Sequence, residues 1–194
     1  MAFINSSVRE INCKIVYYGA GLGGKTTNLQ WIFDQMGHQD SDAMLSLSTE
    51  HDRTLFFDFL PVDLGKVRDF RVRLHLYTVP GQASYHASRK LILRGVDGVV
   101  FVADSSPGRM DANLEAIEDL ERNLRDANED FFALPYVLQL NKRDLADALP
   151  AEEMKAHLAR KGEPVFEAVA SQGLGILETL KGAARLVLAK LKEG

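Results

Sequence analysis

The stretch GAGLGGKT, residues 19–26, decides the fold class of this chain. It matches the pattern G-x-x-x-x-G-K-[ST], whose four fixed places are held by Gly19, Gly24, Lys25 and Thr26. A β-branched and aromatic run at 11–18 precedes it, and an apolar period typical of a helix follows it. A glycine-rich loop between a strand and a helix predicts a phosphate-binding loop, because its backbone N–H groups can turn toward phosphate oxygens.

The same pattern predicts roles for individual residues. The Lys25 ammonium should reach the β- and γ-phosphates of a nucleotide, and the Thr26 hydroxyl should be a ligand of Mg²⁺. The remaining contacts should come from the loop and the first helical turn, a set that comprises Gly21, Leu22, Gly23, Gly24, Lys25, Thr26 and Thr27. A glycine-rich turn that serves only tight packing is the alternative, and the strand–loop–helix context disfavours it.

Outward from this loop, strands and helices alternate. Further strands are expected at 54–62, 70–79, 96–103, 136–140 and 165–170. Helices are expected at 25–36, 83–94, 109–127 and 152–160, with a last one carrying an apolar face from Ile176 to Leu191. Residues 37–50 are expected to be a loop and 64–69 a turn. The short connection makes 54–62 and 70–79 an antiparallel hairpin, so the sequence predicts an α/β domain with a mostly parallel sheet.

Composition sets the remaining limits. A chain of 194 residues is expected to form one domain, residues 1–194. A net charge of −4 disfavours non-specific nucleic-acid binding. The single cysteine, Cys13, excludes an internal disulfide and a multi-cysteine zinc site. No apolar stretch reaches the ~20 residues needed to cross a bilayer, and no signal peptide is visible, so a cytoplasmic protein without direct membrane insertion is expected.

A second motif, NKRD at 141–144, follows the expected strand 136–140. The Asp144 carboxylate could accept two N–H groups from guanine, whereas adenine presents an acceptor at N1, so this residue would select guanine. Asn141 would brace the loop and touch the base, and the Lys142 stem would cover the ring. NKRD alone could be a solvated turn; its position behind a phosphate loop, on the same sheet edge, favours base recognition.

Together, GAGLGGKT and NKRD on an alternating α/β chain resemble a Ras-type small GTPase. The segments REINCKIVYYGAGLGGKTTNLQ, STEHDRTLFFDFLP, LHLYTVPGQASYHASRKLILRGVDGVVFVADS and NKRDL further resemble the bacterial MglA family. This resemblance implies a three-layer P-loop NTPase fold with a Ras-like six-stranded mixed sheet, one antiparallel strand and helices on both faces. It also implies binding of GTP and GDP with Mg²⁺, and slow hydrolysis of GTP.

The resemblance further implies partners. The expected partner is an MglB-like GTPase-activating protein of the Roadblock fold, together with effectors that control cell polarity and the motility or pilus machinery. Partners of this kind would recruit the GTP form to a cell pole.

The resemblance assigns the run TVPGQ, residues 78–82, to the segment that senses the γ-phosphate. Gly81 would offer its backbone N–H to that phosphate, and Gln82 would orient the attacking water. Gln82 as an ordinary surface glutamine is the alternative. Thr78 stands where Ras-type proteins carry an aspartate that supports Mg²⁺, so the metal should be held more weakly or in another arrangement.

The polar stretch 37–54 occupies the position of the first switch segment. Thr54 is expected to close on Mg²⁺ and the γ-phosphate, and Arg53 to act as an internal arginine finger, with a solvated loop arginine as the alternative. Asp58 interrupts an apolar strand, and it could face solvent, pair with a cation or approach the metal. The backbone N–H of Ala170 is expected at guanine O6.

Two other functions fit parts of the sequence. A P-loop kinase acting on a small molecule is disfavoured by NKRD. A GTP-bound interaction subunit that does not hydrolyse its nucleotide is disfavoured by Gln82 and Arg53, and the missing aspartate at Thr78 keeps it open.

Overall fold

The computed structural model describes residues 3–5, 7–36, 45–48, 54–67, 69–80 and 86–193. In chain order the elements are β1 (Phe3–Asn5), β2 (Glu10–Tyr18), α1 (Lys25–Gln35), β3 (Leu45–Ser48), β4 (Thr54–Val67), β5 (Phe70–Thr78), α2 (His86–Leu93), β6 (Gly98–Asp104), α3 (Met110–Asp126), β7 (Tyr136–Asn141), α4 (Ala151–Leu158), β8 (Val165–Glu167), the 3₁₀ turn η2 (Ala170–Gln172) and α5 (Ile176–Glu193). Strands and helices alternate as expected for an α/β chain.

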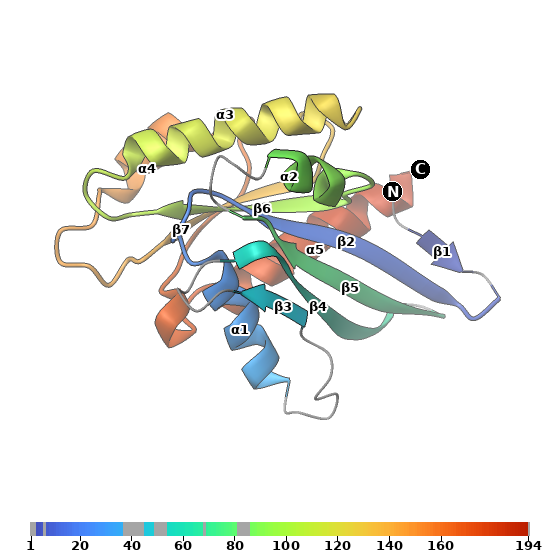
Figure 1. The fold of residues 1–194 in the computed structure, drawn as a ribbon. Helices are drawn as coiled ribbons and strands as arrows, with labels where there is room; N and C mark the ends of the chain where they lie inside the picture. The colour runs from blue at the N-terminus through green and yellow to red at the C-terminus, as the bar shows by residue number, and fades with distance from the viewer. Residues whose placement is uncertain are drawn as a thin grey trace.

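The described strands form one mixed sheet in the order β3-β4-β5-β2-β6-β7-β8, and β1 pairs with β2 (Figure 1). Six of them, β2, β4, β5, β6, β7 and β8, are the strands that the sequence predicts. Of these six, β4 runs antiparallel to its neighbour β5, and the other pairs are parallel. The predicted Ras-like arrangement is confirmed, and β1 and β3 add two short antiparallel strands to it.

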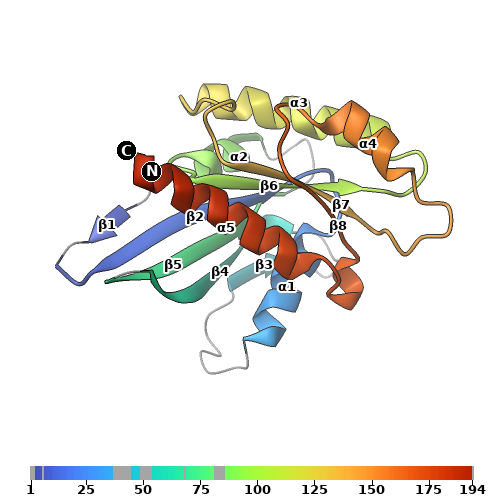
Figure 2. The same cartoon turned by 180° about the vertical axis from the view of Figure 1, so that it is seen from behind.

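Helices cover both faces of the sheet (Figures 1 and 2). The alternation of side chains along β2 shows why: Val16 and Tyr18 belong to a core with α2, α3 and α4, whereas Ile15 and Tyr17 belong to a core with α1 and α5. Successive side chains of a strand point to opposite faces, so a strand buried on both sides needs apolar residues throughout. In β6 all seven residues are buried.

Three predicted segments differ from the structure by more than two residues. Within the stretch 37–50, expected to be a loop, residues 45–48 form β3, because pairing with β4 gives their backbone groups partners. The turn expected at 64–69 is wrong for most of its length, since β4 continues to Val67 through a register shift and Gly65 takes a φ of +80°. The strand expected at 165–170 ends at Glu167, and η2 begins at Ala170. The helix expected at 83–94 is described from His86, and 83–85 lie outside the described residues.

Among the described helices, none has the length and apolar character required of a membrane span.

Candidate nucleotide-binding site

The phosphate loop joins the end of β2 to the start of α1, at the carboxyl edge of the sheet. At two positions of this loop, neighbouring atoms lie so close that only glycine fits. A Cβ on Gly19 would lie 2.2 Å from the carbonyl oxygen of Val102, and one on Gly24 would lie 2.2 Å from Nδ2 of Asn141. Both glycines also have positive φ, +138° and +99°. The motif is therefore fixed by backbone conformation and by close packing against β6 and β7.

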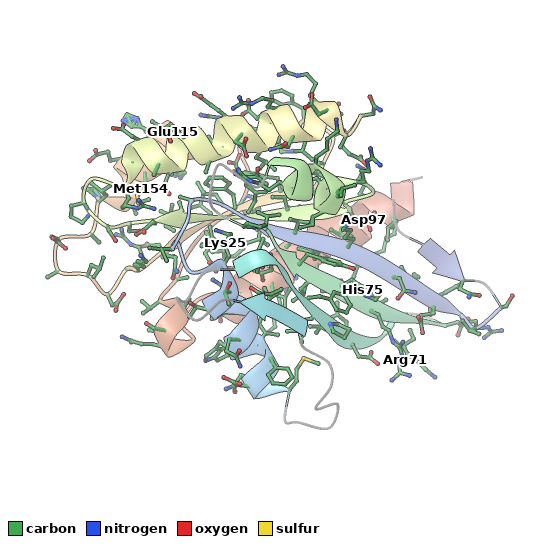
Figure 3. The ribbon with its side chains drawn as sticks, in the orientation of Figure 1. Lys25, Arg71, His75, Asp97, Glu115 and Met154 are labelled. Atoms are coloured by element: carbon green, nitrogen blue, oxygen red, sulfur yellow. The ribbon has the colours of Figure 1, made fainter. Side chains whose placement is uncertain are left out.

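Lys25 begins α1 and is buried where this helix meets the sheet (Figure 3). Its Nζ donates to the carbonyl oxygens of Gly19 at 2.9 Å and Ala20 at 2.7 Å. Burial, followed by the positive charge of Arg89, lowers the pKa of Lys25 to about 7, while the negative charge of Asp58 opposes this shift. A buried ammonium at a helix N-terminus that carries no acidic residue in its first turn is suited to an anion such as a phosphate group.

One side chain ties the base-recognition loop to the phosphate loop. Asn141, the last residue of β7, donates from Nδ2 to the Gly23 carbonyl at 2.9 Å. Its Oδ1 accepts the backbone N–H of Ala170, also at 2.9 Å. The three predicted segments, GAGLGGKT, NKRD and the stretch around Ala170, therefore meet at one place. Asn141 braces them as the sequence predicts, and contacts of Asn141 and Ala170 with guanine stay predictions.

The other two residues predicted to recognise the base, Lys142 and Asp144, are half-buried and exposed, respectively. Asp144 is exposed in the turn after β7, which leaves its carboxylate accessible to a base. Lys142 has a φ of +66°, and its Nζ donates to Oδ2 of Asp104 at 2.8 Å. The roles of Asp144 in reading guanine and of the Lys142 stem in covering the ring stay predictions.

Asp58 lies at the phosphate loop and not at the surface. It is fully buried, and its Oδ2 accepts hydrogen bonds from the hydroxyls of Thr26 at 2.6 Å and Thr78 at 2.8 Å. Thr78 Oγ1 in turn accepts the backbone N–H of Asp58 at 2.8 Å. Of the three alternatives for Asp58, exposure to solvent is wrong. The carboxylate lies beside the hydroxyl that is expected to ligate Mg²⁺.

Thr78 stands where Ras-type proteins carry an aspartate, and its hydroxyl contacts the carboxylate of Asp58 on the neighbouring antiparallel strand β4. Within the described residues, no group of three or more His, Cys, Asp or Glu side chains could by itself hold a metal. Hard oxygen donors from one hydroxyl and one carboxylate fit Mg²⁺, which is usually bound by one or two carboxylates together with substrate phosphates.

Four predicted site residues lie wholly or partly outside the described part of the chain. Arg53, Gly81 and Gln82 lie outside the described residues. Thr54 begins β4, where its backbone pairs with Ser48, and its side chain is not among those described. The catalytic assignments therefore remain predictions.

Asp104 and Arg109 also belong to the site, and neither is predicted from the sequence. Asp104 ends β6 and is almost fully buried, with its side chain 2% exposed. Arg109 immediately precedes α3, and its Nη2 donates to the Gly21 carbonyl of the phosphate loop at 2.7 Å. A charged residue directly after a buried strand, at the sheet edge shared by both motifs, was the available signal for Asp104.

The fold and the site define a P-loop nucleotide-binding protein of Ras-like topology. Comparison with known proteins agrees: residues 2–182 match the family model described as the ADP-ribosylation factor family. The chain is 58% identical, over all 194 residues and the whole of the relative, to the mutual gliding-motility protein MglA of Myxococcus xanthus. It is 29% identical to the human Ras-related protein Rab-40A-like over 122 residues, which are 62% of this chain and 42% of that protein.

The chain therefore belongs to the ADP-ribosylation factor family of Ras-like small GTPases, and within them it is of the MglA type. Membership in this family makes it a GTPase. It decides against the P-loop kinase and the non-hydrolysing subunit.

Proposed function

We propose that residues 1–194 form a single G domain that works as a nucleotide-dependent switch, binding GTP with Mg²⁺ and hydrolysing it slowly. The observation that carries this proposal is the bracing of the phosphate loop by the base loop: Asn141 holds the Gly23 carbonyl from one side and accepts the Ala170 N–H on the other. A nucleotide bound across this junction would meet Lys25 with its phosphates and Asp144 with its base.

Thr26 and Asp58 are the protein groups proposed to hold Mg²⁺. When bound, the ion neutralises charge on the β- and γ-phosphates. Asp58 accepts a hydrogen bond from the Thr26 hydroxyl, so it orients that oxygen from the side of the sheet. Thr78 orients Asp58 in turn, through the pair of hydrogen bonds between its hydroxyl and the aspartate. Thr54 is proposed as the further ligand that closes over the site from the start of β4.

Hydrolysis is assigned to Gln82 and Arg53. Gln82 would orient the attacking water, and Arg53 would neutralise charge that develops on the transferred phosphoryl group, as arginine fingers do. Both residues would act in the transition state, so they should contribute little to the affinity for GTP or GDP. Gly81 would bind the γ-phosphate through its backbone N–H.

The similarity to the Myxococcus protein supports a biological proposal. That relative is named for gliding motility, and its identity of 58% extends over the whole chain. We propose that this GTPase likewise controls motility and cell polarity. Its GTP form would be recruited to a cell pole by partners, and an MglB-like Roadblock protein would stimulate hydrolysis.

Single-turnover hydrolysis of GTP, with and without the Roadblock protein, tests this proposal. The parent should be stimulated by the partner. Arg53→Ala and Gln82→Leu should keep their nucleotide affinity within a few-fold and lose most of the stimulation, since an arginine finger is typically worth ~10³–10⁵ in rate. Stimulation of Arg53→Ala equal to that of the parent would show that the charge comes from the partner.

A further inference from the structure

Arg109 holds the tip of the phosphate loop from outside. Its Nη2 donates to the Gly21 carbonyl at 2.7 Å, and its Nε lies 3.5 Å from Oδ2 of Asp104. The Arg109 side chain is 35% exposed, so it reaches the loop from the surface. None of the motifs discussed above includes this residue.

Asp104 anchors Arg109 and the base loop together. The same Oδ2 accepts Lys142 Nζ at 2.8 Å, and Oδ1 accepts the N–H and the hydroxyl of Ser106 at 3.0 and 2.6 Å. Although burial opposes it, these hydrogen bonds and the charge of Lys142 lower the pKa of Asp104. The carboxylate is therefore ionised at neutral pH and holds two cations, Lys142 in the base loop and Arg109 in the β6–α3 loop beside the phosphate loop.

Two carbonyls of the phosphate loop are thus held by side chains from other elements: Gly21 by Arg109, and Gly23 by Asn141. In a planar trans peptide the C=O and the following N–H point in opposite directions. A donor that holds the Gly21 carbonyl away from the nucleotide therefore turns the Leu22 N–H toward the nucleotide. Asn141, by holding the Gly23 carbonyl, turns the Gly24 N–H toward the nucleotide in the same way. Inward N–H groups are what a phosphate loop offers to phosphate oxygens.

We propose that Arg109 is a positioning residue that aims the Leu22 N–H at the nucleotide's terminal phosphates and so slows nucleotide release. This inference rests on the proposed nucleotide site and adds a residue to it. Asp104 supports Arg109, and its bond to Lys142 links retention of the phosphates to the loop that reads the base.

The experiment measures the dissociation rate of a fluorescent GDP analogue from the full chain with Mg²⁺ present. Arg109→Ala should release it about tenfold faster, as expected for one lost hydrogen bond from a charged donor. Arg109→Lys should recover part of the loss, because an ammonium reaches the carbonyl or the carboxylate but lacks the fork that reaches both. Arg160→Ala is the matched control. Arg160 also pairs with a carboxylate, that of Glu121, and donates to a carbonyl, that of His157, and its side chain is 27% exposed.

A second measurement separates positioning from general loss of structure. The inhibition constants of GDP and GMP are compared in competition with the same analogue. Arg109→Ala should weaken the binding of GDP and leave the inhibition constant of GMP unchanged within twofold, because GMP lacks the phosphates that the Leu22 N–H would contact. The inference would be overturned if Arg109→Ala released the analogue at the parent's rate, or if it weakened the binding of GDP and GMP equally. A parent that retains no GDP analogue would overturn the proposed nucleotide site itself, and the role of Arg109 with it.

Discussion

Thr78→Asp restores the aspartate of Ras-type proteins, and we expect it to destabilise this protein severely. The Thr78 hydroxyl lies 2.8 Å from Oδ2 of Asp58, and both residues are fully buried. A carboxylate at position 78 would replace a donor with a second negative charge. The variant would then hold two buried carboxylates where the parent holds one carboxylate and two hydroxyl donors.

The size of the expected loss of stability follows from the close approach of the two carboxylates. Two unit charges about 4 Å apart repel by about 4 kcal/mol at an effective dielectric constant of about 20. Unfolding of a typical domain costs about 5–15 kcal/mol, so this one contact could remove a large part of the stability. Exchanging the partners in the double variant Asp58→Thr/Thr78→Asp restores one carboxylate and one hydroxyl across the same strand pair, and most of the stability should return.

Urea unfolding at pH 7.5 without nucleotide measures this effect. Thr78→Asp should unfold at a much lower urea concentration than the parent, and the double variant should lie between them, nearer the parent. Saturating GDP with Mg²⁺ should narrow the gap between Thr78→Asp and the parent, because a divalent cation beside both carboxylates offsets their repulsion. A midpoint for Thr78→Asp equal to the parent's, or a double variant no more stable than the single one, would refute the assigned pairing of Asp58 with Thr78.

The remaining predictions concern buried polar groups. The pKa of Lys25 lies near 7, below its ordinary value, so binding of a phosphate above pH 7 should be coupled to protonation of Lys25. The affinity for GDP should therefore fall as the pH rises from 7 to 9, by up to tenfold per pH unit. Lys25→Arg should abolish this pH dependence. The same shift should make the nucleotide-free protein more stable as the pH rises above 7, since the unfolded chain then binds more protons, and urea titrations at pH 7 and 9 check this sign. Gln139→Leu should cost about 2–3 kcal/mol of unfolding free energy in urea titrations, because the buried amide of Asn28 loses both of its 3.0 Å hydrogen bonds to this side chain. Asp119→Asn should cost about 3–5 kcal/mol in the same assay, because it leaves the buried guanidinium of Arg89 without its carboxylate; equal stability would show that the pair contributes nothing.

Local motifs made the phosphate loop and the base loop predictable. GAGLGGKT needs its glycines for backbone reasons that any such loop shares, and the structure shows both Gly19 and Gly24 in conformations and contacts that exclude a side chain. NKRD follows a buried strand, so its place at the same sheet edge could be inferred from the parallel order of the strands. Both elements carry their information within a few residues of sequence.

The partner of Asp58 could not be predicted, because it depends on a one-residue register shift. At the turn Val67 pairs with Phe70, and that register continued along the hairpin would bring Asp58 opposite Val79. The shift between Asp63 and Lys66 changes the pairing, so that Phe59 lies opposite Tyr77 and Asp58 beside Thr78. A bulge of this kind is an outcome of packing across the sheet, and nothing in the local composition specifies it.

β3 and Arg109 were missed for related reasons. The residues of β3 are a short polar and apolar alternation, LSLS, which forms a strand because β4 lies beside it. Arg109 sits in a loop between β6 and α3, far in sequence from the Gly21 carbonyl that it holds. Contacts made by a single loop side chain over such a separation have no periodic or motif signal.

The choice of base by Asp144 is the most direct test of the central claim, that the phosphate loop and the NKRD loop form one guanine-nucleotide site. The measurement is competition of GDP, ADP and xanthosine diphosphate for the parent and for Asp144→Asn. The parent should bind GDP and reject ADP. Asp144→Asn should lose affinity for GDP and gain affinity for xanthosine diphosphate, because the carboxamide N–H can donate to the carbonyl oxygen that xanthine carries at C2 where guanine has an amino group. An Asp144→Asn variant that binds GDP as tightly as the parent, still rejects ADP and shows no gain for xanthosine diphosphate would contradict the account.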